Sequence, residues 1–72
     1  MSKSREEYLQ RNYQYHAPKN DQVARYQKIR EAQKQLAEAI FECCPDSPER
    51  TEALKYNETC GMWANKSIAC NE

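Results

Sequence analysis

The sequence CPDSPER, residues 44–50, separates two long stretches that are rich in helix-forming residues. Within it, Ser47 suits the N-cap position of a helix, Pro48 suits the first helical position, and Glu49 follows in the first turn. The turn that remains has about three residues, and so short a connection makes two long helices antiparallel neighbours. The motif therefore predicts an all-α chain built on an antiparallel helical hairpin.

The stretch before this motif, residues 21–44, is predicted to form the first long helix. Asp21 suits its N-cap, and residues 22–44 contain no glycine or proline. Spacings of three and four residues link one stripe, which consists of Tyr26, Ile29, Gln33, Leu36, Ile40 and Cys43. Such spacing places side chains on one face of a helix, as in a coiled coil.

The stretch after the turn, residues 47–71, is predicted to form the second long helix. One stripe on it consists of Leu54, Asn57, Gly61, Ala64 and Ile68. A second stripe beside the first consists of Ala53, Tyr56, Cys60 and Trp63. Glycine at position 61 lowers helix propensity by about 1 kcal/mol relative to alanine. Gly61 therefore indicates a position where the two helices approach closely.

A third, shorter helix is predicted at the start of the chain, over residues 1–12. Ser2 or Ser4 can cap it, and its first turn is acidic, which the helix dipole favours. Its only apolar side chains after Met1 are Tyr8 and Leu9. Because an isolated helix of this length is marginal in water, we expect it to need a partner surface.

The whole chain is small for an independently stable fold. It has 72 residues, of which 39% are apolar and 31% charged. A chain of this length buries only about 60% of the surface that its unfolded form exposes. The apolar faces of the hairpin are also wider than a two-helix contact covers, which leaves Phe41, Met62 and Trp63 exposed on one copy. We therefore expect residues 1–72 to form a single helical domain that assembles into a homo-oligomer.

Composition argues against several functional classes. No apolar run is long enough to span a membrane and no signal peptide is present, which favours an intracellular protein. The four cysteines include no CxxC pair, so we expect reduced packing residues and no metal, although Cys70 leaves an intermolecular disulfide open. One histidine, and no Gly-rich phosphate loop, GxSxG or HExxH motif, argue against an enzyme and against a cofactor.

Charge and ring side chains gather in the first half of the chain. Residues 1–35 hold eight Lys/Arg against four Asp/Glu and residues 36–72 hold three against seven, so the halves carry +4 and −4. With a pI near 6.6, wrapping of DNA is disfavoured, and a small phosphorylated ligand fits better. Rings stack on nucleobases, and Lys or Arg pairs with phosphate oxygens. We predict a ligand site formed by Tyr15, His16, Pro18, Lys19, Arg25, Tyr26, Lys28 and Arg30.

A structural interpretation of the same residues stays open. Residues 13–20, YQYHAPKN, are expected to form a loop because Pro18 restricts the residue before it to extended conformations. Tyr13 and Tyr15 would then pin this loop against the helices while His16 caps a turn. The basic residues would form a solvated helix face with acidic partners, which is a common arrangement.

The motifs together resemble a family of small phage proteins, the anti-CBASS cyclic-nucleotide sponges, which are related to the hairpin domain of anti-Thoeris sponges. The match runs over residues 13–71, and its pieces are residues 15–19 (YHAPK), 22–30 (QVARYQKIR), 44–47 (CPDS) and 62–69 (MWANKSIA). The resemblance implies a homo-oligomer, typically a hexamer, that binds cyclic dinucleotides such as cyclic GMP-AMP between protomers without cleaving them. It also implies action in the cytoplasm of the host bacterium, where sequestration starves the immune effector.

Two differences from the family pattern concern the ligand. Ala17 stands where the family usually has a second proline, so the loop is expected to be less rigid. Cys70 stands where members carry an arginine suited to phosphates near a symmetry axis, which argues against a cyclic-trinucleotide site. The alternative function is a structural or protein-binding hairpin that inhibits a host protein, with Tyr13 and Tyr15 as interface anchors. A nuclease for the same ligands is a third hypothesis.

Overall fold

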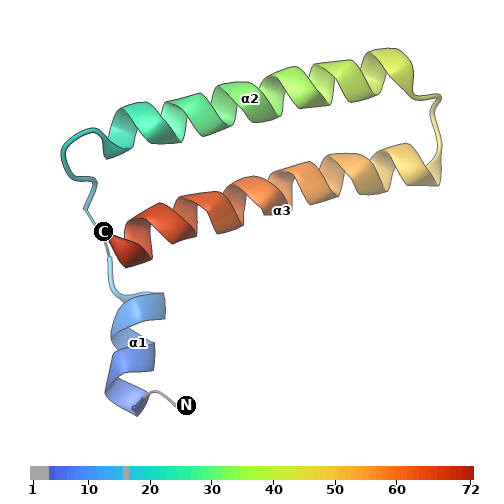
Figure 1. Cartoon of the computed structure of the whole chain (residues 1–72). Helices are drawn as coiled ribbons and strands as arrows, with labels where there is room; N and C mark the ends of the chain where they lie inside the picture. Colours follow the sequence, from blue (N-terminus) through green and yellow to red (C-terminus); the bar gives the residue numbers. More distant parts are fainter. Residues whose placement is uncertain (1–3, 16) are drawn as a thin grey trace.

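The computed structural model describes residues 4–15 and 17–72, and within them the chain is helical, without a strand (Figure 1). Helix α1 spans Arg5–Tyr13, α2 spans Gln22–Cys43 and α3 spans Pro48–Asn71. Helices α2 and α3 run antiparallel side by side, and α1 lies apart from them, near the end of α3 (Figure 1). The predicted helical hairpin with a short leading helix is therefore confirmed. The predicted homo-oligomer concerns further copies of the chain and stays a prediction.

Two of the three sequence signals for helix starts act as predicted. The Ser4 hydroxyl accepts the backbone N–H of Glu7 at 3.1 Å, and the Ser47 hydroxyl accepts that of Arg50 at 3.1 Å. Each bond satisfies one of the N–H groups that the first turn of a helix leaves unpaired. Ser2, the other candidate for the first cap, lies outside the described residues.

The start of α2 is built differently from the prediction. Asp21 occupies the N-cap position, but its side chain makes no capping hydrogen bond and lies 3.3 Å from the Arg25 guanidinium. The turn is closed by Gln22, whose N–H donates to the Lys19 carbonyl at 2.8 Å and whose side-chain oxygen accepts the Lys19 N–H at 2.9 Å. Asn20 takes a left-handed φ of 48°, which asparagine tolerates. Gln22, only 4% exposed, thus ties the loop to the first turn of α2, and the side-chain cap predicted for Asp21 is not formed.

Helices α2 and α3 are joined near their middles by a reciprocal pair of amide hydrogen bonds. Gln33 Nε2 donates to the Asn57 carbonyl at 2.7 Å, and Asn57 Nδ2 donates to the Gln33 carbonyl at 2.9 Å. Gly61 lies about one turn further along α3, and a Cβ atom there would come within 2.1 Å of Gln33 Nε2. The predicted close approach at Gly61 is confirmed, and the neighbour is a polar side chain.

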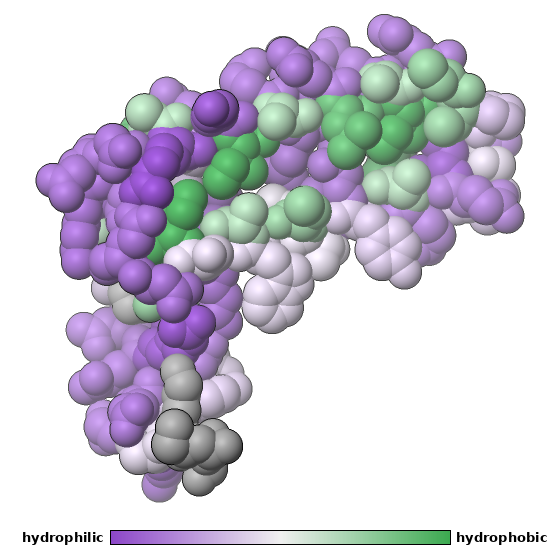
Figure 2. Space-filling view, in the orientation of Figure 1, coloured by the Kyte–Doolittle hydropathy of each residue, from purple (hydrophilic) through white to green (hydrophobic). Residues whose placement is uncertain are grey.

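The hairpin has very little interior. Among the described residues no hydrophobic side chain is buried, and only Gln22 and Gly61 are buried at all. Phe41, Met62 and Trp63 are 55%, 70% and 65% exposed, which confirms the prediction that one copy leaves them uncovered. Figure 2 shows apolar side chains gathered between α2 and α3, most broadly toward the turn that joins them. A large apolar surface is therefore available to another molecule.

Candidate ligand-binding site

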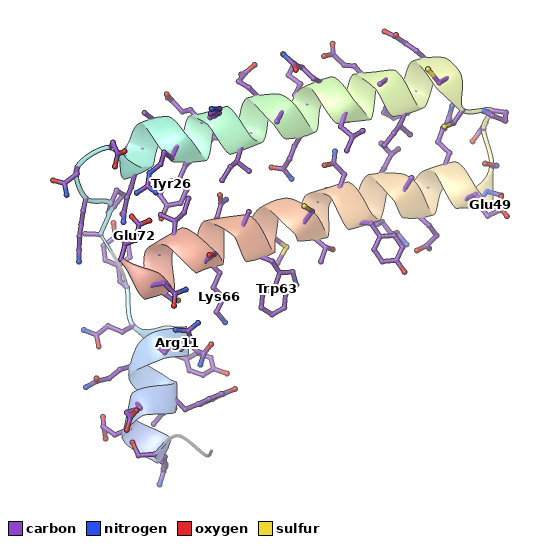
Figure 3. All side chains as sticks on the ribbon, in the orientation of Figure 1. Arg11, Tyr26, Glu49, Trp63, Lys66 and Glu72 are labelled. Atoms are coloured by element: carbon purple, nitrogen blue, oxygen red, sulfur yellow. The ribbon has the colours of Figure 1, made fainter. Side chains whose placement is uncertain are left out.

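Two of the predicted phosphate-binding residues, Lys19 and Arg25, meet at the carboxyl end of α3. The residue that they share there is Glu72 (Figure 3). Arg25 Nη1 donates to Glu72 Oε2 at 2.8 Å, and Arg25 Nη2 donates to Glu72 Oε1. Lys19 Nζ donates to the Glu72 backbone oxygen at 3.3 Å, and Gln22 Nε2 donates to Oε1 at 3.3 Å. The loop and the first turn of α2 therefore already hold an anion.

The pKa values of this pair reflect that arrangement. The hydrogen bond from Arg25, followed by the one from Gln22, lowers the pKa of Glu72 to about 2. The same hydrogen bond to Glu72 raises the pKa of Arg25 above its already high ordinary value, with Asp21 adding a smaller electrostatic contribution. Both groups stay charged at any physiological pH. Their side chains are 38% and 42% exposed, so water screens the attraction between them.

The other predicted residues do not join this cluster. Tyr15 in the loop is 80% exposed, and Pro18 is exposed as well. Tyr26 is half-buried on the side of α2 that faces α3 (Figure 3). Lys28 and Arg30 are exposed and make no hydrogen bond or ion pair within the described residues. His16, which was also predicted for the site, lies outside the described residues.

Helix geometry explains why the basic residues of α2 do not converge. Arg25 and Arg30 are five residues apart on one continuous helix, which separates their directions by about 140°. Arg25 and Arg30 therefore leave opposite flanks of α2, and Lys28, three residues after Arg25, lies on the Arg25 side without contacting Glu72. One ligand on one chain can contact Lys19 and Arg25 together, but Arg30 faces a different direction. Among the predicted basic residues, only Lys19 and Arg25 contact the same residue on one chain, and the predicted ligand site stays a prediction.

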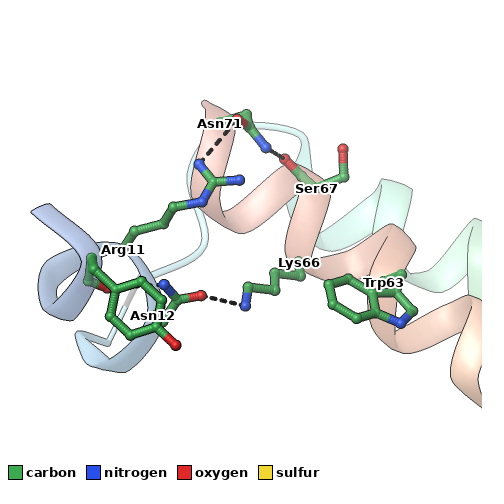
Figure 4. Close-up of a pocket in the computed structure, with 7 residues that line it drawn as sticks. Arg11, Asn12, Trp63, Lys66, Ser67 and Asn71 are labelled. Carbon is green, nitrogen blue, oxygen red and sulfur yellow. Dashed lines mark hydrogen bonds between the residues drawn. The ribbon is translucent and has the colours of Figure 1, made fainter. Parts of the chain in front are cut away.

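A second constellation of rings and cations lies in a groove between α1 and the last part of α3 (Figure 4). The groove has a volume of about 550 Å³ and is lined by Tyr8, Arg11, Asn12, Trp63, Lys66, Ser67 and Asn71. None of the residues predicted for the ligand site lines it. From the sequence, Tyr8 was expected only as an apolar contact and Trp63 only as an interface residue.

Polar contacts across this groove hold α1 against α3. Lys66 Nζ donates to Asn12 Oδ1 at 2.5 Å, and Arg11 Nη1 donates to Asn71 Oδ1 at 3.3 Å (Figure 4). Arg11 also donates to the Cys70 carbonyl at 3.5 Å, and the Cys70 thiol donates to the Arg11 carbonyl at 3.3 Å. These contacts supply the partner surface that the short helix was predicted to need.

The exposed indole of Trp63 gives this groove a stacking surface. Lys66 Nζ lies 5.6 Å from the centre of the Trp63 ring, within the range of a cation–π contact. A signal for the pair is present in the sequence, because residues three apart on a helix share a face and Lys66 is the only cation after Lys55. The groove itself joins residues more than fifty positions apart, which no local pattern indicates.

The described residues offer no metal site and no membrane span. No group of three or more His, Cys, Asp or Glu side chains among them is placed to hold a metal ion. All four cysteines are free thiols. No helix in this part of the chain is long and apolar enough to cross a membrane.

The comparison with protein families identifies the hairpin. The family model of the Acb2/Tad1 hairpin domain matches residues 5–69. The chain belongs to this family. It is the family of the anti-CBASS and anti-Thoeris sponges, so the resemblance found in the motifs is confirmed. No curated protein and no solved structure matches the chain.

Membership in the Acb2/Tad1 hairpin family gives the chain a general function. It implies a cyclic-nucleotide sponge, and the family is a binding domain rather than a known class of enzyme. Every residue predicted for the ligand site lies inside the matched range, as do the CPDS and MWAN motifs. Residues 70–72 lie beyond its end, so the contact of Glu72 with Arg25 is not part of the Acb2/Tad1 hairpin match.

Proposed function

We propose that this chain captures cyclic dinucleotides of CBASS immunity, such as cyclic GMP-AMP, and holds them without cleavage. The observation that supports it most directly is that Lys19 and Arg25 both contact Glu72, Arg25 at its carboxylate and Lys19 at its backbone oxygen, within an Acb2/Tad1 hairpin. A phosphate has the same requirement for cationic donors as the carboxylate seen there. The chain would be phage-encoded and act in the cytoplasm of the host bacterium, where capture keeps the messenger from its effector.

In this proposal the residues of the loop and of α2 have distinct roles. Lys19 and Arg25 bind one phosphate. Tyr15 stacks on a base, because its side chain is exposed in the same loop that carries Lys19. The remaining candidates border the ligand or position the loop; they are His16, Pro18, Tyr26, Lys28 and Arg30. Cyclic trinucleotides are not proposed as ligands, because Cys70 replaces the arginine expected near a symmetry axis.

We further propose that the site is completed by a second copy of the chain in a homo-oligomer, with a hexamer as the expected size. Arg25 and Arg30 leave opposite flanks of α2, so both can contact the same ligand only if they come from different copies. The exposed apolar side chains of α2 and α3, among them Phe41, Met62 and Trp63, give such copies an interface.

A release experiment tests this function. The protein is incubated with cyclic GMP-AMP, freed of unbound ligand by desalting, and heat-denatured, and the supernatant is analysed by liquid chromatography. We expect intact cyclic GMP-AMP in stoichiometric amounts. A linear product would instead indicate a nuclease. An empty supernatant would contradict capture and favour the protein-binding alternative, in which Tyr13 and Tyr15 anchor an interface with a host protein.

Matched variants connect the released ligand to the proposed site. Replacing Lys19 and Arg25 together by alanine should abolish retention, because both cationic donors that meet at Glu72 are lost. Replacing Lys34 and Lys55 together by alanine makes the same change in net charge at exposed helix positions. We expect this control to retain ligand like the parent chain. Equal retention by both double variants would place the phosphate elsewhere.

A further inference from the structure

We propose that the carboxylate of Glu72 is an internal occupant of the phosphate subsite, which the ligand must displace, so that Glu72 determines the affinity of the site. This inference deepens the proposed function and rests on it. It concerns a residue outside the range matched by the family model.

The Glu72 carboxylate is bound in the way in which a protein binds an anionic ligand. The guanidinium of Arg25 reaches both carboxylate oxygens with separate nitrogen atoms, and Gln22 adds a third donor to Oε1. Such a fork fits two oxygens of a phosphate in the same way as it fits a carboxylate. Lys19 Nζ also contacts Glu72, by donating a hydrogen bond to the backbone oxygen of that residue. A phosphate that used these donors would therefore have to replace Glu72.

The contact is also weak enough to be displaced. Both side chains are more than a third exposed, and ion pairs in such positions contribute little because water and salt screen them. A cyclic dinucleotide adds base stacking that the carboxylate lacks. Asp21 lies 3.3 Å from the Arg25 guanidinium and would keep Arg25 near its place after Glu72 has left.

Displacement of Glu72 requires only a local change. Helix α3 ends at Asn71, so Glu72 is the first residue after the helix. The last turn of α3 stays attached to α1 through the bonds of Arg11 with Asn71 and Cys70. The side chain of Glu72 can therefore leave Arg25 while the hairpin and the docked α1 keep their positions.

Isothermal titration with cyclic GMP-AMP at low salt tests the inference on Glu72→Gln. This variant keeps the size of the side chain and removes only its charge. We expect it to bind about two- to fivefold more tightly than the parent chain, the range that follows from losing an exposed ion pair. Glu49→Gln is the matched control, because it makes the same charge change at the opposite end of α3 (Figure 3). Its affinity should equal that of the parent.

The same substitution in chains that also carry Arg25→Ala distinguishes competition between Glu72 and the ligand for Arg25 from a general effect of charge. In chains that carry Arg25→Ala, the substitution Glu72→Gln should give no gain in affinity. Unchanged or weaker binding of Glu72→Gln, with the parent chain still binding, would overturn the role of Glu72 and leave the sponge function standing. A gain that persists without Arg25 would overturn it as well.

Inorganic pyrophosphate gives a readout that does not depend on the cyclic ligand. Its binding is followed by the NMR signal of the Arg25 side-chain N–H groups in the parent chain and in Glu72→Gln. We expect the midpoint of the titration to fall about two- to fivefold in the variant. If the parent fails to bind cyclic GMP-AMP, the sponge function fails while this titration still decides the role of Glu72. Equal midpoints in both chains would overturn it.

Discussion

At the scale of single residues, the ion pair of Arg25 and Glu72 makes a testable contribution to stability. The pKa of Glu72 is about 2 in the folded chain, against 4.5 for an unperturbed glutamate. A depressed pKa gives stability that is fully present above the unfolded pKa and is lost as the pH falls through the folded one. We therefore expect the parent chain to exceed Glu72→Gln in unfolding free energy at pH 7, and this difference to vanish between about pH 5 and about pH 2. Urea unfolding of both chains across that range measures it, and a constant difference would contradict the assignment.

Tyr15 gives a second prediction at this scale. Its ring is 80% exposed, so removing it should cost the folded chain little while removing a stacking surface for a base. Tyr15→Ala should weaken cyclic GMP-AMP binding by about 1–3 kcal/mol, about ten- to a hundredfold. Tyr15→Phe, which keeps the ring, should lose far less. Titration calorimetry, with circular dichroism to verify helicity, decides the matter. Parent-like binding by Tyr15→Ala would support the structural interpretation of the loop.

The sequence indicated the right kind of residue for the anion site but not its full set of neighbours. Lys19 and Arg25 were predicted from their charge and their position beside a ring-rich loop. Glu72 follows Arg25 by 47 positions, and no local spacing relates them. Arg30 was predicted with them because its charge lies in the same stretch of interleaved rings and cations, although helix geometry turns it to the other flank of α2.

At the scale of elements, the contact of Gln33 with Gly61 couples the two long helices. Alanine favours a helix over glycine by about 1 kcal/mol, but a Cβ at position 61 would collide with the Gln33 carboxamide and break its bond to Asn57. Gly61→Ala should therefore bring no gain in unfolding free energy in the parent chain. In a Gln33→Ala background the collision is gone, and the same substitution should stabilise by about 1 kcal/mol. Thermal and urea unfolding of the four chains completes this double-mutant cycle, and equal effects in both backgrounds would contradict the contact.

Element starts and faces were the most predictable part of the fold. Ser4 and Ser47 cap their helices because capping depends on a side chain and the backbone three residues later. The stripes that contain Gln33, Asn57 and Gly61 were each predicted to share one face of a helix, and these residues meet between α2 and α3. The hydrogen bonds between them, and the docking of α1 on α3, depend on tertiary contacts that periodicity does not specify.

At the scale of the whole molecule, the exposed apolar surface predicts self-association. Trp63 is 65% exposed in one copy, so its loss should leave the helices of a single chain intact. In an assembly the same substitution removes a large buried ring from the interface, where aromatic residues contribute most. We expect Trp63→Ala to reduce the particle mass measured by light scattering and to weaken ligand binding with it. Lys55→Ala, an exposed change on the same helix, should keep both, and a parent-like mass for Trp63→Ala would remove Trp63 from the interface.

Because one copy of the hairpin has almost no interior, its stability should depend on protein concentration. Because no hydrophobic side chain within the described residues of one copy is buried, an assembling chain would gain most of its apolar burial from its neighbours, and folding would obey mass action. We expect the midpoint of thermal unfolding to rise with protein concentration, as scanning calorimetry at several dilutions would reveal, and a midpoint independent of dilution would contradict it. For the proposed sponge in an infected cell, the capacity to bind cyclic nucleotide would then appear only above a threshold concentration of the chain, and not in proportion to the first copies made.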